Sequence, residues 1–372
     1  MAGSQALRLR GGGIAVALTV FFLTSADLAR AQYPSSPSAA IPSGSFADLV
    51  DTGAPPVAMP GPMTAPPSSY GPWVAPAATP VEMGLFDTVT ESIFGKPDPD
   101  TWRPLPLSTL FSEGWNEAWV PSPSGSGGAP RQGWINAADG NLYRLSFFTF
   151  AQGFNDPPKG NAYLGAYTIF TPLSRRLDLI THVPFVLRNN AASGLPIIGG
   201  PNQQAVTTPQ SHTGFGDITF TPRVLLHETK DFSFTGELAV TTPTGDEPLA
   251  GKTTFLTPAV AFWNNFAGGW VIRGGIGVAI PTDGGGENLI GQLAIGQTLT
   301  AHDVPLLGDF TYYLSTVVNT HLDDGDQTSV ALTPGLRSHV GNDWYFLAGL
   351  PTPVTNARVA DLGMIFWFMK AW

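Results

Sequence analysis

The sequence contains no cysteine, few charges and, after residue 31, no long apolar run. Without cysteine the chain has no disulfide, no thiolate metal site and no cysteine nucleophile. Charged residues make up 12% of the chain, and its 18 Lys and Arg residues are scattered through a sequence of net charge -10. Phosphate binding needs clustered basic side chains, so this pattern argues against a nucleic-acid partner. A helical membrane protein is also disfavoured, because each spanning helix needs roughly eighteen apolar residues in a row.

From Leu142 to Trp372, the sequence alternates apolar and polar residues in segments of roughly ten residues, which is the length that a tilted strand needs to cross a bilayer. Tight connections and longer ones follow each other in turn, as in outer-membrane barrels. Because backbone groups find no water in a bilayer, a sheet can cross only when it closes and pairs every edge. The predicted strands are 142–152, 161–173, 176–188, 214–227, 232–243, 253–265, 269–281, 288–302, 306–321, 327–340, 343–351 and 356–369.

These segments predict an all-β fold: a closed antiparallel transmembrane β-barrel at residues 142–372, with about twelve strands and with ten or fourteen as alternatives. Outer-membrane barrels keep their short turns in the periplasm and their long loops outside. The predicted location is therefore the cell outer membrane, with lipid around the barrel and both termini in the periplasm. A soluble β-sandwich is a weaker alternative, because it accounts for neither the apolar outer faces nor the aromatic C-terminus.

The N-terminus has the features of an export signal. Arg8 and Arg10 form a positive start, Ile14–Leu23 is a short apolar core, and Ala29 and Ala31 flank a cleavage site. We predict a cleaved signal peptide at residues 1–31, with an uncleaved anchor as the alternative.

The region 32–83 is predicted to be a disordered arm. Between residues 32 and 80 it contains twelve prolines, many Ala and Ser residues, and only Asp48 and Asp51 as charges. Such a segment cannot bury enough apolar surface to fold. The arm is expected to be a periplasmic linker, and binding to the cell wall or to a periplasmic partner is the alternative.

Two further segments precede the barrel. Residues 84–96 place five apolar side chains at helical spacing and predict one short amphipathic helix. This helix is expected to act as a plug, to lie on the membrane surface at the periplasmic mouth, or to pack against the barrel base. Residues 97–141 are rich in Pro, Gly and Trp but show no sustained period. They are predicted to be irregular and to lie against or inside the barrel as a candidate plug.

Alternation along each strand separates a lipid-facing side from a lumen-facing side. Charges fall on the lumen side, where they avoid the cost of contact with lipid. The mixed signs predict either a water-filled path or an ion-pair network that closes a narrow barrel. The predicted pore-lining residues are Asp178, Arg188, Asp217, Arg223, Glu237, Arg273, Asp309 and Arg337.

Aromatic residues and prolines recur at matching positions in the strands. Aromatic side chains beside the tight turns are predicted to face outward as a periplasmic girdle, namely Trp263, Trp270, Trp344 and Tyr345. A Thr-Pro pair recurs in alternate strands, at Pro172, Pro222, Pro258 and Pro334. Because proline cannot donate to a strand ladder, these positions predict bulges or kinks in the wall, or strand ends near a rim.

Two resemblances add to this interpretation. The segment Gly363–Trp372 resembles the C-terminal insertion signal of bacterial outer-membrane barrels, which implies the barrel-assembly machinery as a partner during insertion. The segments Gly214–Ile218, Pro222–Val224 and Pro243–Asp246 resemble the family of outer-membrane barrels associated with the meta pathway of phenol degradation, often described as transporters. That resemblance covers roughly residues 142–372. It implies a barrel that passes small, often hydrophobic or aromatic compounds.

Enzyme chemistry is not predicted. His321 is followed by Asp323, Asp324 and Asp326, but one such pairing in the sequence does not make a catalytic site. The same loop lacks the ligand spacing of a calcium-binding EF-hand. No catalytic residue, cofactor or metal site is therefore predicted. We predict a passive outer-membrane channel or transporter for small molecules, constricted by loop 189–213. A structural or anchoring barrel without transport is the alternative.

Overall fold

The structure, a computed structural model, describes residues 83–154, 161–189, 213–246, 249, 251, 253–322, 328–356 and 360–372. The predicted signal peptide and all but the last residue of the predicted arm lie outside the described residues, as does most of loop 189–213. Among the residues that are described, no helix is long and apolar enough to cross a membrane.

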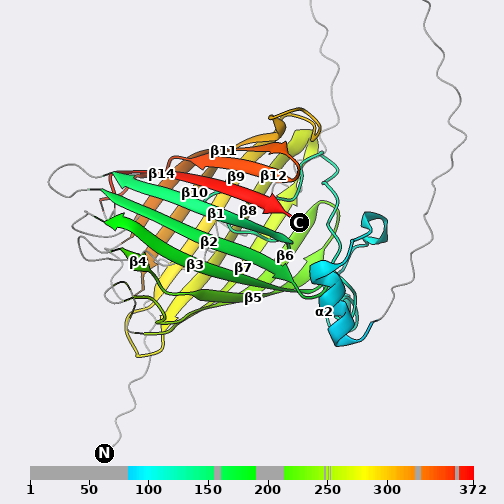
Figure 1. The fold of residues 1–372 in the computed structure, drawn as a ribbon, viewed down its shortest axis with the longest axis horizontal. Coiled ribbons are helices and arrows are strands. Elements are labelled where there is room, and N and C mark those ends of the chain that lie inside the picture. Colours follow the sequence, from blue (N-terminus) through cyan, green and yellow to red (C-terminus); the bar gives the residue numbers. More distant parts are fainter. Residues whose placement is uncertain are drawn as a thin grey trace, which may run out of the picture. The chain divides into compact units, whose positions relative to one another are not determined.

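Within the described residues, one α-helix precedes a large β-sheet (Figure 1). The helix, α2, spans Leu85–Phe94, and the short 3-10 helices are η1 (Pro99–Thr101), η2 (Leu107–Thr109) and η3 (Ala267–Gly269). The strands are β1 (Leu145–Phe154), β2 (Ala162–Pro172), β3 (Leu177–Asn189), β4 (Gly214–Phe215), β5 (Thr219–Glu228), β6 (Phe232–Thr241), β7 (Phe255–Asn265), β8 (Trp270–Pro281), β9 (Asn288–Thr298), β10 (Gly308–His321), β11 (Ser329–Gly341), β12 (Trp344–Gly349), β13 (Thr352–Pro353) and β14 (Leu362–Ala371).

The sheet closes on itself. β1 pairs antiparallel with β14, from Leu145 opposite Ala371 to Phe154 opposite Leu362. The two-residue strands β4 and β13 pair with β3 and β11 and extend the wall locally. The result is a closed antiparallel barrel of twelve strands, which confirms the predicted fold class. The largest boundary differences are at β14, which begins at Leu362, and at β5, which begins at Thr219 after the separate short strand β4.

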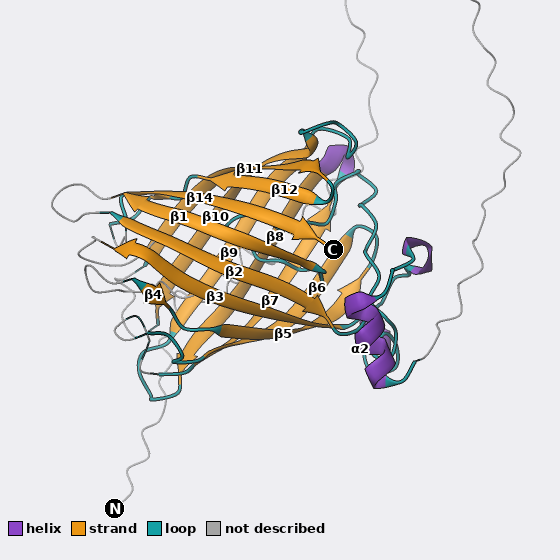
Figure 2. Ribbon diagram, viewed as in Figure 1, coloured by secondary structure: helices purple, strands orange, loops and turns teal. Residues whose placement is uncertain are grey.

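The two ends of the barrel differ. The connections at 173–176, 229–231, 266–269, 299–307 and 342–343 lie at one end, which we call the turn end. The C-terminus and α2 lie at this end too (Figure 2). The other connections are mostly longer, and we call their end the loop end.

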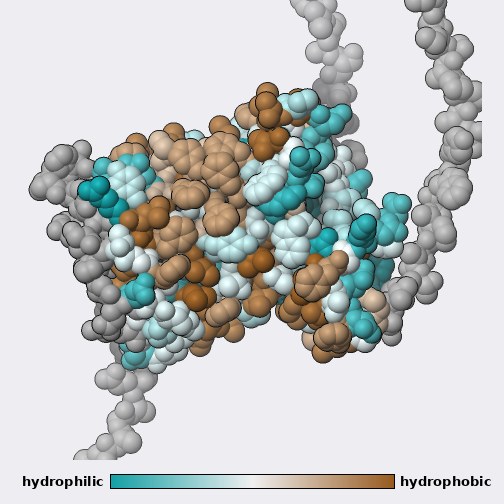
Figure 3. All heavy atoms as spheres, viewed as in Figure 1, coloured by the Kyte–Doolittle hydropathy of each residue, from teal (hydrophilic) through white to brown (hydrophobic). Residues whose placement is uncertain are grey.

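Side chains alternate between the outside of the barrel and its interior, as the pleat of a strand requires. On β1, Phe148 and Phe150 are exposed, whereas Thr149 and Ala151 are buried. Apolar residues cover much of the outer surface over the strands (Figure 3). The strand residues exposed there include Phe220, Leu238, Leu256, Leu293, Ile295, Leu314, Leu336 and Phe368.

The predicted aromatic girdle is wrong at two of its four positions. Trp270 and Trp344 are outward, with 38% and 44% of their surface exposed, but Trp263 and Tyr345 are 1% and 5% exposed and lie inside. Arg131 stacks on the Trp263 ring at 4.8 Å, and Gln132 donates to the Tyr345 hydroxyl at 3.1 Å. The prediction failed because a barrel this wide has interior partners for large rings, which the strand sequences do not show.

The Thr-Pro pairs fall at two kinds of position. Pro222, Pro258 and Pro334 lie within β5, β7 and β11 and are exposed on the outside, whereas Pro172 is the last residue of β2. The recorded pairs of β5 with β6 pass from Phe220 directly to Arg223, and so skip Pro222. A residue without an N–H interrupts the ladder in this way.

Candidate functional site: the barrel interior

Residues 129–143, which we call the inner segment, lie inside the barrel. Ala129, Ile135 and Ala138 are completely buried, and Trp134 and Asn136 nearly so. Strands from all around the barrel contribute inward-facing side chains that contact this segment. The Trp134 ring, for example, stacks on Tyr313 of β10 at 4.9 Å between ring centres.

Side chains of the barrel wall form hydrogen bonds with backbone groups of the inner segment, which is not in a strand. The Ile135 N–H donates to the Tyr313 hydroxyl at 3.0 Å, and the Ser315 hydroxyl donates to the Ile135 carbonyl at 2.9 Å. Asn136 donates through Nδ2 to Thr333 Oγ1 at 2.9 Å. Buried backbone groups without a partner are costly, so these polar positions on β10 and β11 fit a non-strand segment between them.

Two arginines of the wall, on β5 and β8, bind the later part of the segment at Ala138 and Asp139. Arg223 of β5 donates to the Asp139 carbonyl at 3.0 Å, and Arg273 of β8 donates to the Ala138 carbonyl at 2.9 Å. Arg273 also donates to the Gln132 carbonyl and forms an ion pair with the Asp139 carboxylate. The Arg273 side chain therefore connects the early part of the inner segment, at Gln132, to its later part, at Ala138 and Asp139.

Arg223 has a second role inside the wall. Its Nη2 lies 2.6 Å from Asp178 Oδ2 on β3, and both side chains are completely buried. Glu237 of β6 stands opposite Arg223 in the strand register. Asp178 and Arg223 therefore form a buried pair in contact with the inner segment, and the half-buried Glu237 lies beside them on the next strand.

Arg337 and Asp309 form another group near the turn end. Arg337 Nη2 is 3.8 Å from Asp309 Oδ2, and the guanidinium lies 4.8 Å from the centre of the Tyr345 ring. His302 Nδ1 lies 2.7 Å from the same carboxylate oxygen. This group does not include the charges around Arg223.

The remaining two predicted pore-lining residues lie toward the loop end. Asp217 accepts hydrogen bonds from the backbone N–H groups of Gly245 and Gly251, at 3.0 and 2.6 Å, and so holds the loop between β6 and β7. Arg188 is exposed near the end of β3. The eight predicted residues therefore serve different parts of the barrel and do not form one ring.

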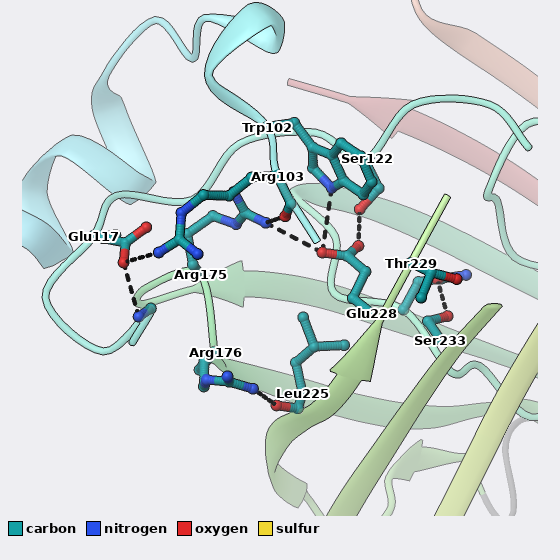
Figure 4. A network of polar contacts seen from close by, with 12 residues as sticks. Trp102, Arg103, Glu117, Ser122, Arg175, Arg176, Leu225, Glu228, Thr229 and Ser233 are labelled. Atoms are coloured by element: carbon teal, nitrogen blue, oxygen red, sulfur yellow. Dashed lines mark hydrogen bonds and ion pairs between the residues drawn. The ribbon is translucent and has the colours of Figure 1, made fainter. Parts of the chain in front are cut away.

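The strongest buried charge cluster was missed by the sequence analysis. Glu228, the last residue of β5, lies 2.7 Å from Arg131 of the inner segment and 3.2 Å from Arg175 of the turn between β2 and β3. Trp102 donates to the same carboxylate at 3.2 Å, and so does the Ser122 hydroxyl (Figure 4). Burial lowers the pKa of both Arg131 and Arg175, and the adjacent Glu228 carboxylate acts in the opposite direction.

Glu228 lies one residue beyond the predicted strand 214–227, so the sequence analysis did not assign it to the lumen, and alternation alone would not have placed it there. Counted in steps of two from the inward-facing Arg223, position 228 falls on the outer face. The pairing of β5 with β6 shifts between Leu225 and His227, however, and this shift turns Glu228 inward. A register shift of this kind leaves no mark in the apolar pattern.

Residues 102–122 lie across the turn end and are tied to the same wall. The backbones of Leu105 and Glu228 exchange hydrogen bonds of 3.0 and 2.9 Å. Arg176 donates to the Leu225 carbonyl at 2.9 Å and to Thr109 at 3.0 Å. The chain before the inner segment is therefore fixed at the mouth through which the segment enters.

One side of the interior carries no charge among the described inward-facing residues of β1, β2, β12 and β14. Phe147 of β1 and Trp367 of β14 stack there at 4.3 Å between ring centres. The inward side chains on these strands are Leu145, Phe147, Thr149, Ala151, Ala162, Leu164, Ala166, Thr168, Phe170, Tyr345, Leu347, Ile365, Trp367 and Met369. The inner segment therefore lies between a mainly apolar wall and a wall that bears the arginines.

From the sequence, the histidines were considered as candidates for catalytic or metal sites, and neither kind of site was predicted. In the described part of the chain no three His, Cys, Asp or Glu side chains are grouped so that they could hold a metal ion. His182 is buried and bonded to Thr168 Oγ1 at 2.8 Å. His212 and the acidic residues 323–326 lie outside the described residues.

Comparison with known proteins gives one family and several similar folds. The family model described as "Putative MetA-pathway of phenol degradation" matches residues 148–360. Among solved structures, the COG4313 outer membrane channel from Pseudomonas putida F1 is 11% identical with a TM-score of 0.44, and the match covers 64% of this chain and 98% of that one. The KdgM porin is 8% identical with a TM-score of 0.39, covering 61% and 99% of the two chains. No curated protein matches the sequence.

Proposed function

Because the chain belongs to the family described as "Putative MetA-pathway of phenol degradation", which its model matches over residues 148–360, we propose that it is an outer-membrane channel for small molecules, held closed by its own inner segment. Three lines of support come from the outer surface, from the width of the barrel and from the composition of its inner walls.

The outer surface supports a membrane location. The strands expose apolar side chains such as Phe148, Leu293 and Phe368, and the pairing of β1 with β14 closes the sheet, as a bilayer requires. Trp270 and Trp344 are exposed at the turn end, at the level expected for lipid headgroups. Since short turns lie in the periplasm in such barrels, the turn end is the periplasmic one.

The observation that carries the proposal is the inner segment. A barrel of about eight strands is just wide enough to be filled by its own side chains, and a twelve-stranded barrel is wider. Here the extra width is occupied by residues 129–143, held largely by hydrogen bonds and ion pairs. A barrel that only anchors another protein does not need this width. A channel needs a wide interior for its cargo and a segment that closes it.

The walls around the inner segment indicate the cargo. When the segment leaves, β1, β2, β12 and β14 present a mainly apolar surface that includes Phe147 and Trp367, and the facing strands present Arg223 and Arg273. A small aromatic molecule with one polar group can contact both walls, with its ring on one and its polar atom on the other. We therefore propose small apolar or aromatic compounds as the cargo.

A reversible crosslink tests the proposal. Asn136 Nδ2 of the inner segment and Thr333 Oγ1 of β11 are 2.9 Å apart. The chain has no native cysteine, so the double variant Asn136→Cys with Thr333→Cys can form one disulfide that links the inner segment to β11. Brief channel openings across planar bilayers should be absent in the oxidised protein and should occur after reduction, when the segment can leave, and the two single variants should not respond to oxidation. Binding of a small phenol, measured by equilibrium dialysis, should follow the same pattern.

Absence of both current and phenol binding in the reduced protein, with a folded barrel shown by heat-modifiable gel mobility, would contradict the channel and favour a structural or anchoring barrel. Equal currents in the oxidised and reduced forms would contradict closure by the inner segment.

A further inference from the structure

In helix α2 the two buried side chains are polar, and several large apolar side chains are exposed. Leu85 and Phe86 expose 73% and 81% of their surface, whereas Thr88 and Ser92 expose none. A helix that packs on a protein normally does the reverse. The exposed apolar surface therefore calls for a different partner.

The helix has three distinct faces. Thr88 and Ser92, four residues apart, form the face toward the protein. Leu85, Phe86, Val89 and Ile93 form a second, apolar face beside it. Asp87 and Glu91, also four residues apart, are exposed on the side away from the apolar face, next to Phe94. This arrangement suits a helix with protein on one side, an apolar medium on the second and water on the third.

The orientation of α2 is fixed at the rim of the barrel. The Trp119 N–H donates to Ser92 Oγ at 2.9 Å. Arg144, the residue before β1, donates to the Gly95 carbonyl at 2.9 Å, and its guanidinium lies over the rings of Trp119 and Trp372 at 5.4 and 5.5 Å. The helix is therefore held beside the seam of β1 and β14, at the turn end.

The apolar surface of α2 lies near the apolar outer surface of the barrel. Phe148 and Phe368 are exposed on the two strands of the seam, and Trp372 follows at its end. Figure 3 shows hydrophobic residues both over the strands and at the place of α2. An interfacial helix lies with its apolar face among the lipid chains near the headgroups.

We propose that α2 lies in the periplasmic leaflet of the outer membrane, with the face formed by Leu85, Phe86, Val89 and Ile93 inserted among phospholipid acyl chains. This inference rests on the membrane location in the proposed function. The position of the helix at the rim, its fixed orientation and the nearby lipid-facing surface favour lipid over a second copy of the chain. The acidic face favours the same orientation, because Asp87 and Glu91 then remain in water.

Spin labels at single cysteines test the proposal in the full-length chain. The protein has no native cysteine, so Phe86→Cys, Glu91→Cys and Phe148→Cys each place one label, on the apolar face, the acidic face and the outer barrel wall. The protein is reconstituted in phospholipid vesicles, and power saturation measures the access of oxygen and of a water-soluble nickel chelate. The ratio of oxygen to nickel access at position 86 should resemble that at 148 and exceed that at 91 by about threefold or more.

The outcomes separate the two proposals. A lipid signature at position 148 with a water signature at 86 would overturn the inference about α2 and leave the membrane location intact. A water signature at both positions would overturn the membrane location itself. Dipolar coupling between labels at position 86 of two molecules would show that a second copy covers the helix. Because Phe86 is exposed, its substitution is not expected to disturb folding, and gel mobility checks this for each variant.

Discussion

The carboxylate of Asp139, in the inner segment, is ion-paired with Arg273 of β8, whose side chain is completely buried and also binds the carbonyls of Gln132 and Ala138. One arginine of the wall thus holds three points of the segment. Loss of its counter-ion would leave a buried cation with carbonyl partners only.

Asp139→Asn should therefore weaken closure. Breaking a fully buried pair typically costs about 3–5 kcal/mol, and we expect about 2–3 kcal/mol here because Asp139 is partly accessible. At tenfold per 1.4 kcal/mol, the ratio of open to closed channels should rise roughly 30- to 100-fold in single-channel recordings. Asp343→Asn, which removes an exposed partner of Lys370, is the matched control and should change little. Equal effects of the two substitutions would rule out a specific role for Asp139.

The Asp178–Arg223 pair should stabilise the barrel wall rather than confer ion selectivity. Asp178→Ala leaves Arg223 buried without its partner and should lower the free energy of unfolding by about 3–5 kcal/mol. Replacing both residues with apolar ones, Asp178→Leu with Arg223→Met, should recover most of that loss. Urea unfolding in detergent micelles measures both effects. A double variant as unstable as the single one would show that the charges are needed for more than each other.

The Glu228 cluster should act as the attachment point of the chain at the turn end. Glu228→Gln leaves Arg131 and Arg175 without their shared carboxylate. We expect hydrogen exchange in residues 102–131 to rise at least about tenfold, because removing one partner of a buried pair costs several kcal/mol. Glu113→Gln removes a more exposed carboxylate from Arg103 and should have a small effect. Unchanged exchange in Glu228→Gln would show that the other contacts suffice.

Two glycines of the inner segment should differ sharply in their tolerance of a side chain. A Cβ on Gly140 would lie 2.5 Å from the backbone carbon of Phe262 on β7, whereas one on Gly133 meets nothing closer than 3.4 Å. Gly140→Ala should therefore displace the segment at a cost of about 1–3 kcal/mol and raise conductance, while Gly133→Ala should not. Identical currents from the two variants would place the closing contact elsewhere.

Strand positions and alternation were predictable because they depend on residues that are near in sequence. The outward positions of Phe220 and Leu238 and the inward position of Arg223 follow from a period of two. The inward positions of Trp263 and Tyr345 did not, since their partners Arg131 and Gln132 lie more than 100 residues away. Glu228 was missed because the predicted strand ended at residue 227, and a longer strand would still have placed it outward, since a bulge shifts the register before it.

The sequence predicted that residues 97–141 lie against or inside the barrel, but it did not predict the path that residues 129–143 follow through the interior, for a related reason. These residues do not form a strand, so no periodic pattern in the sequence marks them. They bind side chains such as Tyr313 and Ser315, and nothing in the strand sequence distinguishes these two from other inward-facing residues. Only the composition of the region, rich in Pro, Gly and Trp, distinguished it from a strand or a linker.

Both ends of the inner segment leave the barrel through the same mouth, upstream to Ser122 beside Glu228 and downstream through Arg144 into β1. The segment can therefore be withdrawn in one direction only. A pull on the upstream chain acts along the barrel axis, away from the outer loops, while the junction with β1 stays anchored and limits the travel. In the proposed channel, a force from the loop end and a pull from the turn end would therefore displace the segment in the same direction, and its junction with β1 would limit how far it moves.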